Sequence, residues 1–350
     1  MGRESNKEYN YGIALLRIWM CFEVICFHLL NGSEGWEGHA AELPFYMVGL
    51  YNYEILAVPV FFIVAFIFSS SFDNIGKRLK RLIEPHVFWS TLIFTLYVLL
   101  DCIGVGKFGY GFIDLIMQII FGGAYNKQHW FQIDLIIITL LLYLTFKLLK
   151  KHKKYVAWCL LLLAIFCQYN GANLKIYNLT FPDVINPGHV RFMLGRICEC
   201  LPFATVGVLL CEYNVLKEKG RKTIFIMVMM CGVICLLIKY GVFVNINGYG
   251  YQGVFKIVMA TATVVLFNYL PLGNILPSFL LRIIKYVASY TMAIYFIHVF
   301  IDQALQSLFA DCLVNMLGTL SYCVLVFAIS LAFGVIIHLI PIKFIKRCCV

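Results

Sequence analysis

Long apolar stretches alternate with short polar segments along the whole chain. The first stretch, 11–30, has twenty residues, and a helix rising ~1.5 Å per residue over this length crosses the ~30 Å hydrocarbon core of a bilayer. The pattern predicts an all-α bundle of about ten membrane-spanning helices. Their expected bounds are 11–30, 55–71, 86–103, 130–149, 155–169, 194–213, 223–240, 253–270, 283–304 and 317–340. No segment between the spans is typical of a soluble domain, so residues 1–350 are predicted to form one integral membrane domain.

A further apolar segment, 112–121, is too short to cross the bilayer as a helix. We expect it to be interfacial or re-entrant.

Basic residues are distributed unevenly among the polar segments. Every second segment carries a cluster of lysine and arginine, at 77–81, 147–154, 217–222, 282–285 and 343–347, and the segments between them are poor in both. Because loops rich in lysine and arginine stay in the cytoplasm, this alternation predicts that both termini are cytoplasmic. The net charge of +10 therefore reflects topology and does not indicate nucleic-acid binding.

The composition also indicates a multi-pass membrane protein. Hydrophobic residues make up 62% of the chain and charged residues only 13%. A soluble domain has roughly 25% charged residues.

The first span carries three ionisable side chains, Arg17, Glu23 and His28. Such groups are costly inside a bilayer, and by default they indicate function. Arg17 and His28 are eleven residues apart. That separation is within ~20° of three full turns, so both side chains lie on one helix face, ~16 Å apart. Taken alone, Arg17 could snorkel and His28 could lie at the membrane interface, but this does not explain why both lie on one helix face. Glu23 points ~140° away from His28 and receives no role.

Other spans carry ionisable residues in the half of the membrane that holds His28. By the predicted orientation, His298 lies at a similar depth, and Asp302 follows one turn later on the same face. Asp134 lies near the outer start of the fourth span. A carboxylate usually orients a catalytic histidine, and either aspartate could do so for His28. Alternatively, His298 could donate a hydrogen bond to a backbone carbonyl. The histidines lack the spacing of metal ligands, so no metal site is predicted.

The basic cluster 77–81 contains two arginines at i and i+3, Arg78 and Arg81. Topology explains most of the cluster. Two guanidinium groups at this spacing can also bind a phosphate or pyrophosphate group.

Together these motifs resemble the integral membrane acyltransferase family 3, which contains polysaccharide and cell-envelope O-acyltransferases. The resemblance rests first on the Arg17 and His28 pair and on the Arg78-x-x-Arg81 motif. Three further stretches are similar to family motifs: VPVFFIVAF at 58–66, HWFQIDLIIITLLLYL at 129–144 and SYTMAIYFIH at 289–298.

The chain departs from the family pattern at Ala65-Phe66, where the family usually has Ser-Gly. If the small side chains of Ser-Gly let helices or substrate approach closely there, the larger side chain of Phe66 narrows the space for that approach.

The resemblance implies acyl-CoA-dependent acylation of a sugar hydroxyl, with His28 as the catalytic base. It also implies functional roles for Arg17, Arg78 and Arg81, which we interpret as binding of the donor. The expected donor is acyl-CoA, with acetyl-CoA as the first candidate. The expected partners are a cell-envelope glycan or lipid-linked sugar as acceptor, and membrane lipid. The expected location is the cytoplasmic membrane of a bacterium.

Two other functions stay open at the level of sequence. One is a transporter of a lipid-linked sugar or a small anion, which needs no acyl donor. Transporters often have paired spans broken by glycine or proline in two related halves, and no such pairing is evident. The other is an inactive acyltransferase-like scaffold, which Ala65-Phe66 makes plausible.

Overall fold

The computed structural model describes residues 9–30, 56–67, 74–122, 127–149, 152–170, 187–213, 215, 254–309 and 312–349. Within these ranges every regular element is a helix. The first elements are α1 (Tyr11–Leu30), α3 (Ala57–Ile67), α4 (Ile75–Cys102), α5 (Phe112–Phe121), η3 (Lys127–His129), α6 (Trp130–Leu148) and α7 (Lys153–Asn170). The others are α8 (Pro187–Glu212), α10 (Val254–Tyr269), α11 (Leu272–Ile275), α12 (Ser278–Ser289), α13 (Thr291–Phe309), α14 (Cys312–Leu317), α15 (Thr319–Leu339) and α16 (Lys343–Cys349).

The all-helical membrane fold expected from the apolar pattern is confirmed for the described residues. Six segments in this part of the chain are long and apolar enough to cross a membrane. They are Tyr11–Leu29, Ile75–Cys102, Trp130–Leu148, Lys256–Ile275, Thr291–Phe309 and Leu320–Leu339. The predicted span 223–240 lies outside the described residues, so the count of ten spans and the cytoplasmic position of both termini stay predictions.

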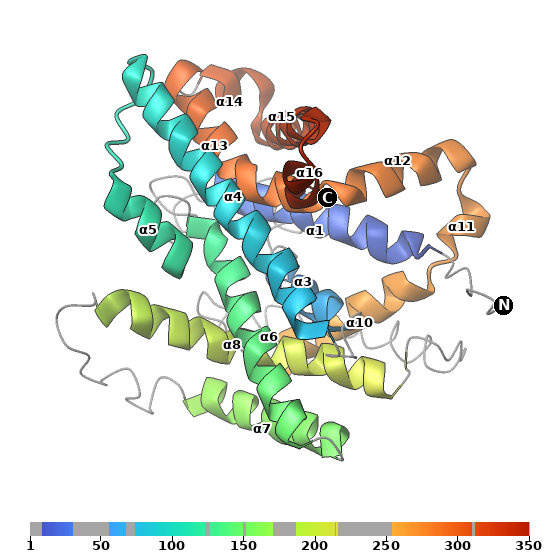
Figure 1. The fold of residues 1–350 in the computed structure, drawn as a ribbon. Coiled ribbons are helices and arrows are strands. Elements are labelled where there is room, and N and C mark those ends of the chain that lie inside the picture. Colours follow the sequence, from blue (N-terminus) through green and yellow to red (C-terminus); the bar gives the residue numbers. More distant parts are fainter. Residues whose placement is uncertain are drawn as a thin grey trace.

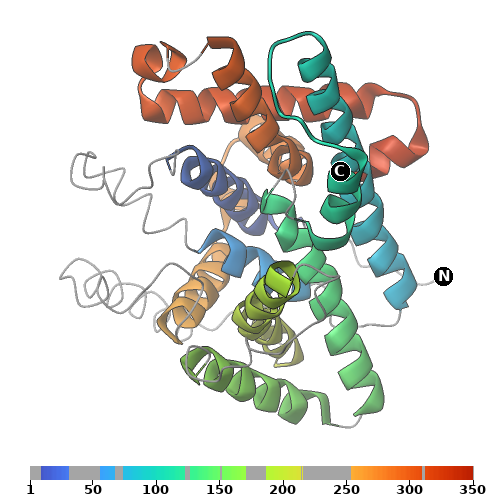
Figure 2. The same cartoon turned by 90° about the vertical axis from the view of Figure 1, so that its left-hand side faces the viewer.

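Helix α1 lies at the centre of the described bundle. It packs against α3, α10, α12, α13 and α15. Figure 2 shows α1 in dark blue between the orange and red C-terminal helices on one side and α3 and α10 on the other. Helices α7 and α8 pack together on the far side of α3 from α1 (Figure 1). The helix that carries Arg17 and His28 is therefore held from several directions.

Two predicted spans begin elsewhere in the structure. Helix α4 begins at Ile75, before the predicted start near 86, so the basic cluster 77–81 forms its first turns. Lysine and arginine are good helix formers, and a hydropathy pattern does not detect a polar helical extension.

The predicted span 283–304 is divided at Tyr290. Helix α12 precedes the division and α13 follows it. Exposed Arg282 and Lys285 on α12, beside apolar side chains, suit a membrane interface better than a hydrocarbon core.

Helix α5 folds back along α4. The Nε2 atom of His86, in the first half of α4, lies 3.0 Å from the carbonyl oxygen of Ile119 near the end of α5. This arrangement fits the interfacial or re-entrant segment expected for 112–121.

Candidate active site

Helices α1 and α13 bring together four polar side chains. The Arg17 Nη2 atom donates a hydrogen bond of 2.8 Å to Thr291 Oγ1. The ring of His28 lies against the ring of His298, with the centroids 5.3 Å apart. Both contacts fall on α13 and follow the same order along the two helices, so α1 and α13 run parallel there. The predicted shared face of Arg17 and His28 is confirmed.

Thr291 is fixed by two further contacts at the start of α13. Its hydroxyl donates to the Ala288 carbonyl at 3.0 Å, which leaves the oxygen free to accept from Arg17. The Cys21 thiol donates to the Thr291 carbonyl oxygen at 3.5 Å. The arginine therefore meets an acceptor whose orientation is set by the backbone.

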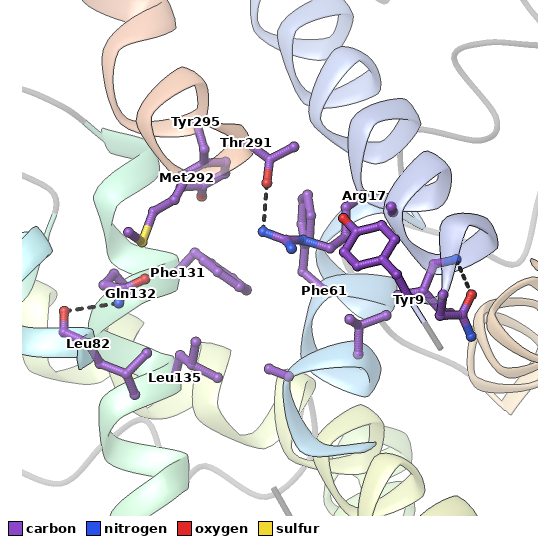
Figure 3. Close-up of a pocket in the computed structure, with 15 residues that line it drawn as sticks. Tyr9, Arg17, Phe61, Leu82, Phe131, Gln132, Leu135, Thr291, Met292 and Tyr295 are labelled. Atoms are coloured by element: carbon purple, nitrogen blue, oxygen red, sulfur yellow. Dashed lines mark hydrogen bonds between the residues drawn. The ribbon is translucent and has the colours of Figure 1, made fainter. Parts of the chain in front are cut away.

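Arg17 lines a partly open cavity of about 580 Å³. The wall is mainly aliphatic and aromatic, and Figure 3 shows Tyr9 at one side, Gln132 at the other and Arg17 between them. The lining residues come from α1 and the two residues before it, and from α3, α4, α6 and α13: Tyr9, Asn10, Ile13, Ala14, Arg17, Phe61, Val64, Ala65, Leu82, Phe131, Gln132, Leu135, Thr291, Met292 and Tyr295. Among these described residues Arg17 is the one charged side chain. Such a cavity suits a thin, mostly apolar ligand with one anionic or polar group.

The side of the cavity nearest the N-terminus is polar. Tyr9 lies there with the Lys285 ammonium group 5.3 Å from its ring centroid. Partial burial raises the pKa of Tyr9 above its ordinary value, and the nearby Arg17 charge partly offsets this, so the phenol is protonated at neutral pH. Asn10 accepts from the Ile13 amide at 2.9 Å and donates to Asn268 on α10 at 2.8 Å.

Tyr295 connects this cavity to the histidine pair. It lines the cavity, and its ring centroid lies 6.0 Å from that of His298. Its hydroxyl donates to the Gln128 carbonyl at 2.7 Å. Phe131 packs against it with the ring centroids 5.5 Å apart. The cavity and the histidines therefore lie on two sides of one aromatic side chain.

The two aspartates expected to orient His28 have other partners. Asp134 accepts from Arg196 Nε at 3.0 Å and from Arg196 Nη2 at 3.3 Å, which ties α6 to α8. Asp302 accepts from the Tyr322 hydroxyl at 2.9 Å and from the Gln306 amide at 3.0 Å. Neither carboxylate orients His28 in this structure. Helical periodicity places a side chain on a face, but it does not reveal a closer partner on another helix.

His298 forms the backbone interaction considered as its alternative. Its Nδ1 atom lies 2.8 Å from the Tyr295 carbonyl oxygen and 3.3 Å from that of Ile294. A third histidine, His129, lies by Phe296 instead, with its Nε2 atom 3.3 Å from the Phe296 carbonyl. Phe296 lies two positions from His298 on α13.

Arg78 and Arg81 lie on the first turns of α4. The Arg78 guanidinium stacks 4.6 Å from the ring centroid of Phe66 and donates to the Ala65 carbonyl at 3.4 Å. Phe66 is fully buried, and Gly207 of α8 lies so close that an added Cβ there would be 2.9 Å from the Phe66 Cβ. Phe66 therefore packs closely against Gly207, and its ring supports the Arg78 guanidinium. Arg81 is exposed.

Within the described residues no group of three or more histidine, cysteine, aspartate or glutamate side chains could hold a metal ion.

Comparison with known families decides the class of protein. The family model described as an acyltransferase domain, acyltransferase family 3, matches residues 10–338. The chain belongs to acyltransferase family 3. No curated protein and no solved structure matches the chain significantly. The matched range runs from the start of α1 to the last turn of α15 and includes every residue of the candidate site except Tyr9. This is therefore a multi-pass membrane protein of an acyltransferase family.

Sequence reasoning missed several residues of this family 3 site, chiefly Thr291, Tyr295 and Tyr9. A signal for Thr291 was present, because it lies seven residues before His298 and therefore on the same face of α13. Tyr9 and Gln132 gave no comparable signal, since their roles follow from how helices pack around the cavity.

Proposed function

We propose that this protein transfers a short acyl group, first of all acetyl, from cytoplasmic acyl-CoA to a hydroxyl of a cell-envelope glycan or lipid-linked sugar. The proposed location is the cytoplasmic membrane of a bacterium. Membership of an acyltransferase family supports the acyl transfer. The observation that carries the proposal is the alignment along α1, where Arg17 lines a cavity and His28 lies farther along the same face.

The cavity supports an acyl-CoA donor. Its volume of about 580 Å³ falls in the range of small-molecule sites, and its wall combines apolar groups with the Arg17 cation. A pantetheine arm is thin and weakly polar, so it suits this wall. Arg78 and Arg81, on the first turns of α4, are proposed to bind the phosphates of the donor. The ~16 Å between Arg17 and His28 along α1 is within the reach of such an arm.

His28 is proposed as the general base. It takes the proton of the acceptor hydroxyl while that oxygen attacks the thioester carbonyl. The new carbon–oxygen bond forms, the carbon–sulfur bond breaks, and His28 returns the proton to the departing thiolate. No covalent enzyme intermediate is needed.

The test is transfer of label from radiolabelled acetyl-CoA in membranes that contain the host's own envelope glycans. Native protein is compared with His28→Ala and Arg78→Ala. The matched controls are His338→Ala, a histidine of α15 whose ring lies 5.6 Å from Tyr290, and Arg282→Ala, an exposed arginine of α12.

We expect label to enter a glycan with native protein and both controls. His28→Ala is expected to lower the rate by about 10²–10⁴-fold, the usual contribution of general base catalysis. Native-rate transfer by His28→Ala would refute the mechanism. No transfer by native protein, with succinyl-CoA also tried and good expression verified, would favour the transporter or the inactive scaffold.

A further inference from the structure

His298 uses only one of its two ring nitrogens in the described structure. The Nδ1 atom faces the carbonyl oxygens of Tyr295 and Ile294, at 2.8 and 3.3 Å. A carbonyl oxygen can only accept, so Nδ1 carries the proton, and Nε2 of the neutral ring is then a bare acceptor. The side chain is 0% exposed, and Nε2 has no hydrogen-bond partner among the described residues. A buried acceptor without a partner is costly, so this atom indicates a role.

The ring that lies against His298 is that of His28. The centroids are 5.3 Å apart and the ring planes differ by 43°. Two imidazole rings joined edge to edge by one N–H···N hydrogen bond have centroids about 5 Å apart, from a hydrogen bond of ~2.9 Å and the size of the rings. A small rotation of the half-buried His28 ring therefore suffices to direct an N–H group at His298 Nε2.

A catalytic histidine needs such an acceptor. A partner for one ring N–H fixes the tautomer and leaves the lone pair on the other nitrogen. No described carboxylate takes this place beside His28, because Asp134 binds Arg196 and Asp302 binds Tyr322. A neutral imidazole is also less costly than a carboxylate within a membrane-spanning helix.

We propose that His298 is the positioning residue for His28, accepting its N–H at Nε2. This inference rests on the proposed function, in which His28 is the base. When His28 takes the proton of the acceptor hydroxyl, His298 Nε2 stabilises the imidazolium through the same hydrogen bond. The proton then goes to the thiolate, and His298 keeps its own proton on Nδ1 throughout.

The first test reads the tautomer of His28 directly and needs no substrate. Protein labelled with ¹⁵N-histidine is reconstituted in nanodiscs, and the His28 signals are assigned with His28→Ala. Native protein is compared with His298→Leu, which removes the acceptor, and His298→Gln, whose amide oxygen can accept near the position of Nε2. The matched control is His129→Leu, a buried histidine whose Nε2 atom faces the Phe296 carbonyl at 3.3 Å.

We expect one His28 tautomer in native protein, His298→Gln and His129→Leu, and a mixture of both tautomers in His298→Leu. An unchanged single tautomer in His298→Leu would overturn the proposal.

Kinetics in the same samples provide the second test. His298→Leu is expected to lower kcat by roughly 10- to 100-fold, part of the 10²–10⁴-fold of general base catalysis, with KM for acetyl-CoA unchanged. His298→Gln should recover much of this loss. If His298 only stabilises the fold, the two variants would give less folded protein but the same kcat per folded molecule. That result would also refute the proposal. If native protein transfers nothing, the proposed function fails, and the tautomers alone decide the positioning role.

Discussion

Thr291 gives the Arg17 guanidinium its direction in the cavity. A hydrogen bond to a charged group contributes about 1.5–3 kcal/mol, and about 1.4 kcal/mol corresponds to a tenfold change in affinity. We therefore expect Thr291→Val to raise KM for the acyl donor about tenfold or more, with a much smaller change in kcat. Thr291→Ser keeps the hydroxyl and should behave as native protein. The measurement is initial rate against acetyl-CoA concentration in membranes.

Thr261 of α10 provides the control for that series. Its hydroxyl donates to the Ile257 carbonyl of its own helix at 2.6 Å. Thr261→Val should leave KM unchanged. An equal KM in Thr291→Val and native protein would show that the Arg17–Thr291 contact has no part in donor binding.

Asp134 and Arg196 form a buried ion pair, with side chains 0% and 10% exposed. Removing one partner of such a pair leaves a buried charge, at a cost of about 3–5 kcal/mol. We expect Asp134→Ala to lower the thermal stability of the purified protein strongly. The double variant Asp134→Leu with Arg196→Met should recover most of it, because an apolar pair of similar volume is often as stable. Melting in detergent, followed by tryptophan fluorescence, measures both.

The same variants decide whether Asp134 also acts on His28. Turnover per folded molecule should match native protein in the double variant. A double variant that is stable but inactive would return Asp134 to the catalytic set.

Sequence alone placed Arg17 and His28 on one face, because helical periodicity relates residues within a single helix. It did not give their partners. Thr291 and His298 lie more than 260 residues farther along the chain, and only packing of α1 against α13 reveals that they meet Arg17 and His28. Sequence also could not show that the two aspartates have other partners. Asp134 is bound by Arg196 on another helix, and Asp302 is bound by Gln306 one turn along its own helix.

Close approach of α1 to α10 depends on Gly12. A Cβ added at Gly12 would overlap the carbonyl oxygen of Phe267, a backbone atom that cannot move without moving α10. Overpacking of this kind costs about 1–3 kcal/mol, so Gly12→Ala should lower the melting temperature. The change lies beside Asn10 and Tyr9, so it should also weaken donor binding.

Gly76 of α4 is the matched control. Nothing lies within 4 Å of a Cβ built at Gly76, and alanine is the better helix former by about 1 kcal/mol. Gly76→Ala should therefore be neutral or slightly stabilising in the same melting experiment. Equal melting temperatures for the two variants would show that α1 and α10 do not pack as described.

Helix ends were less predictable than helix existence, for a physical reason. The hydrophobic pattern reports which residues prefer lipid, whereas a helix continues wherever backbone hydrogen bonds can form. Helix α4 therefore continues through the basic cluster 77–81, and α12 forms a separate amphipathic helix before α13. Segment 112–121 forms a helix with the bounds of the apolar pattern, and its ten residues are too few to cross a bilayer, so its interfacial or re-entrant position stays a prediction.

The position of the cavity in the bundle determines from which side of the membrane a donor can reach Arg17. Tyr9 and Asn10 precede α1 and line the cavity at its N-terminal side. The side on which α1 begins is therefore the side from which a donor reaches Arg17. Acyl-CoA is a cytoplasmic compound too polar to cross a bilayer unaided, so the proposed donor requires a cytoplasmic N-terminus.

Reporter fusions test this orientation. Bacterial alkaline phosphatase, active only outside the cytoplasm, is fused after Asn31, Tyr110, Leu149 or Val350. The distribution of lysine and arginine predicts activity after Asn31 and Tyr110 and none after Leu149 and Val350. A fluorescent protein that folds only in the cytoplasm, fused at the same four positions, should give the opposite pattern. The reverse result at Asn31 and Val350 would place the cavity entrance outside the cell, where acyl-CoA is absent. The donor would then have to be a lipid-linked or exported acyl compound, even if acyl transfer itself were confirmed.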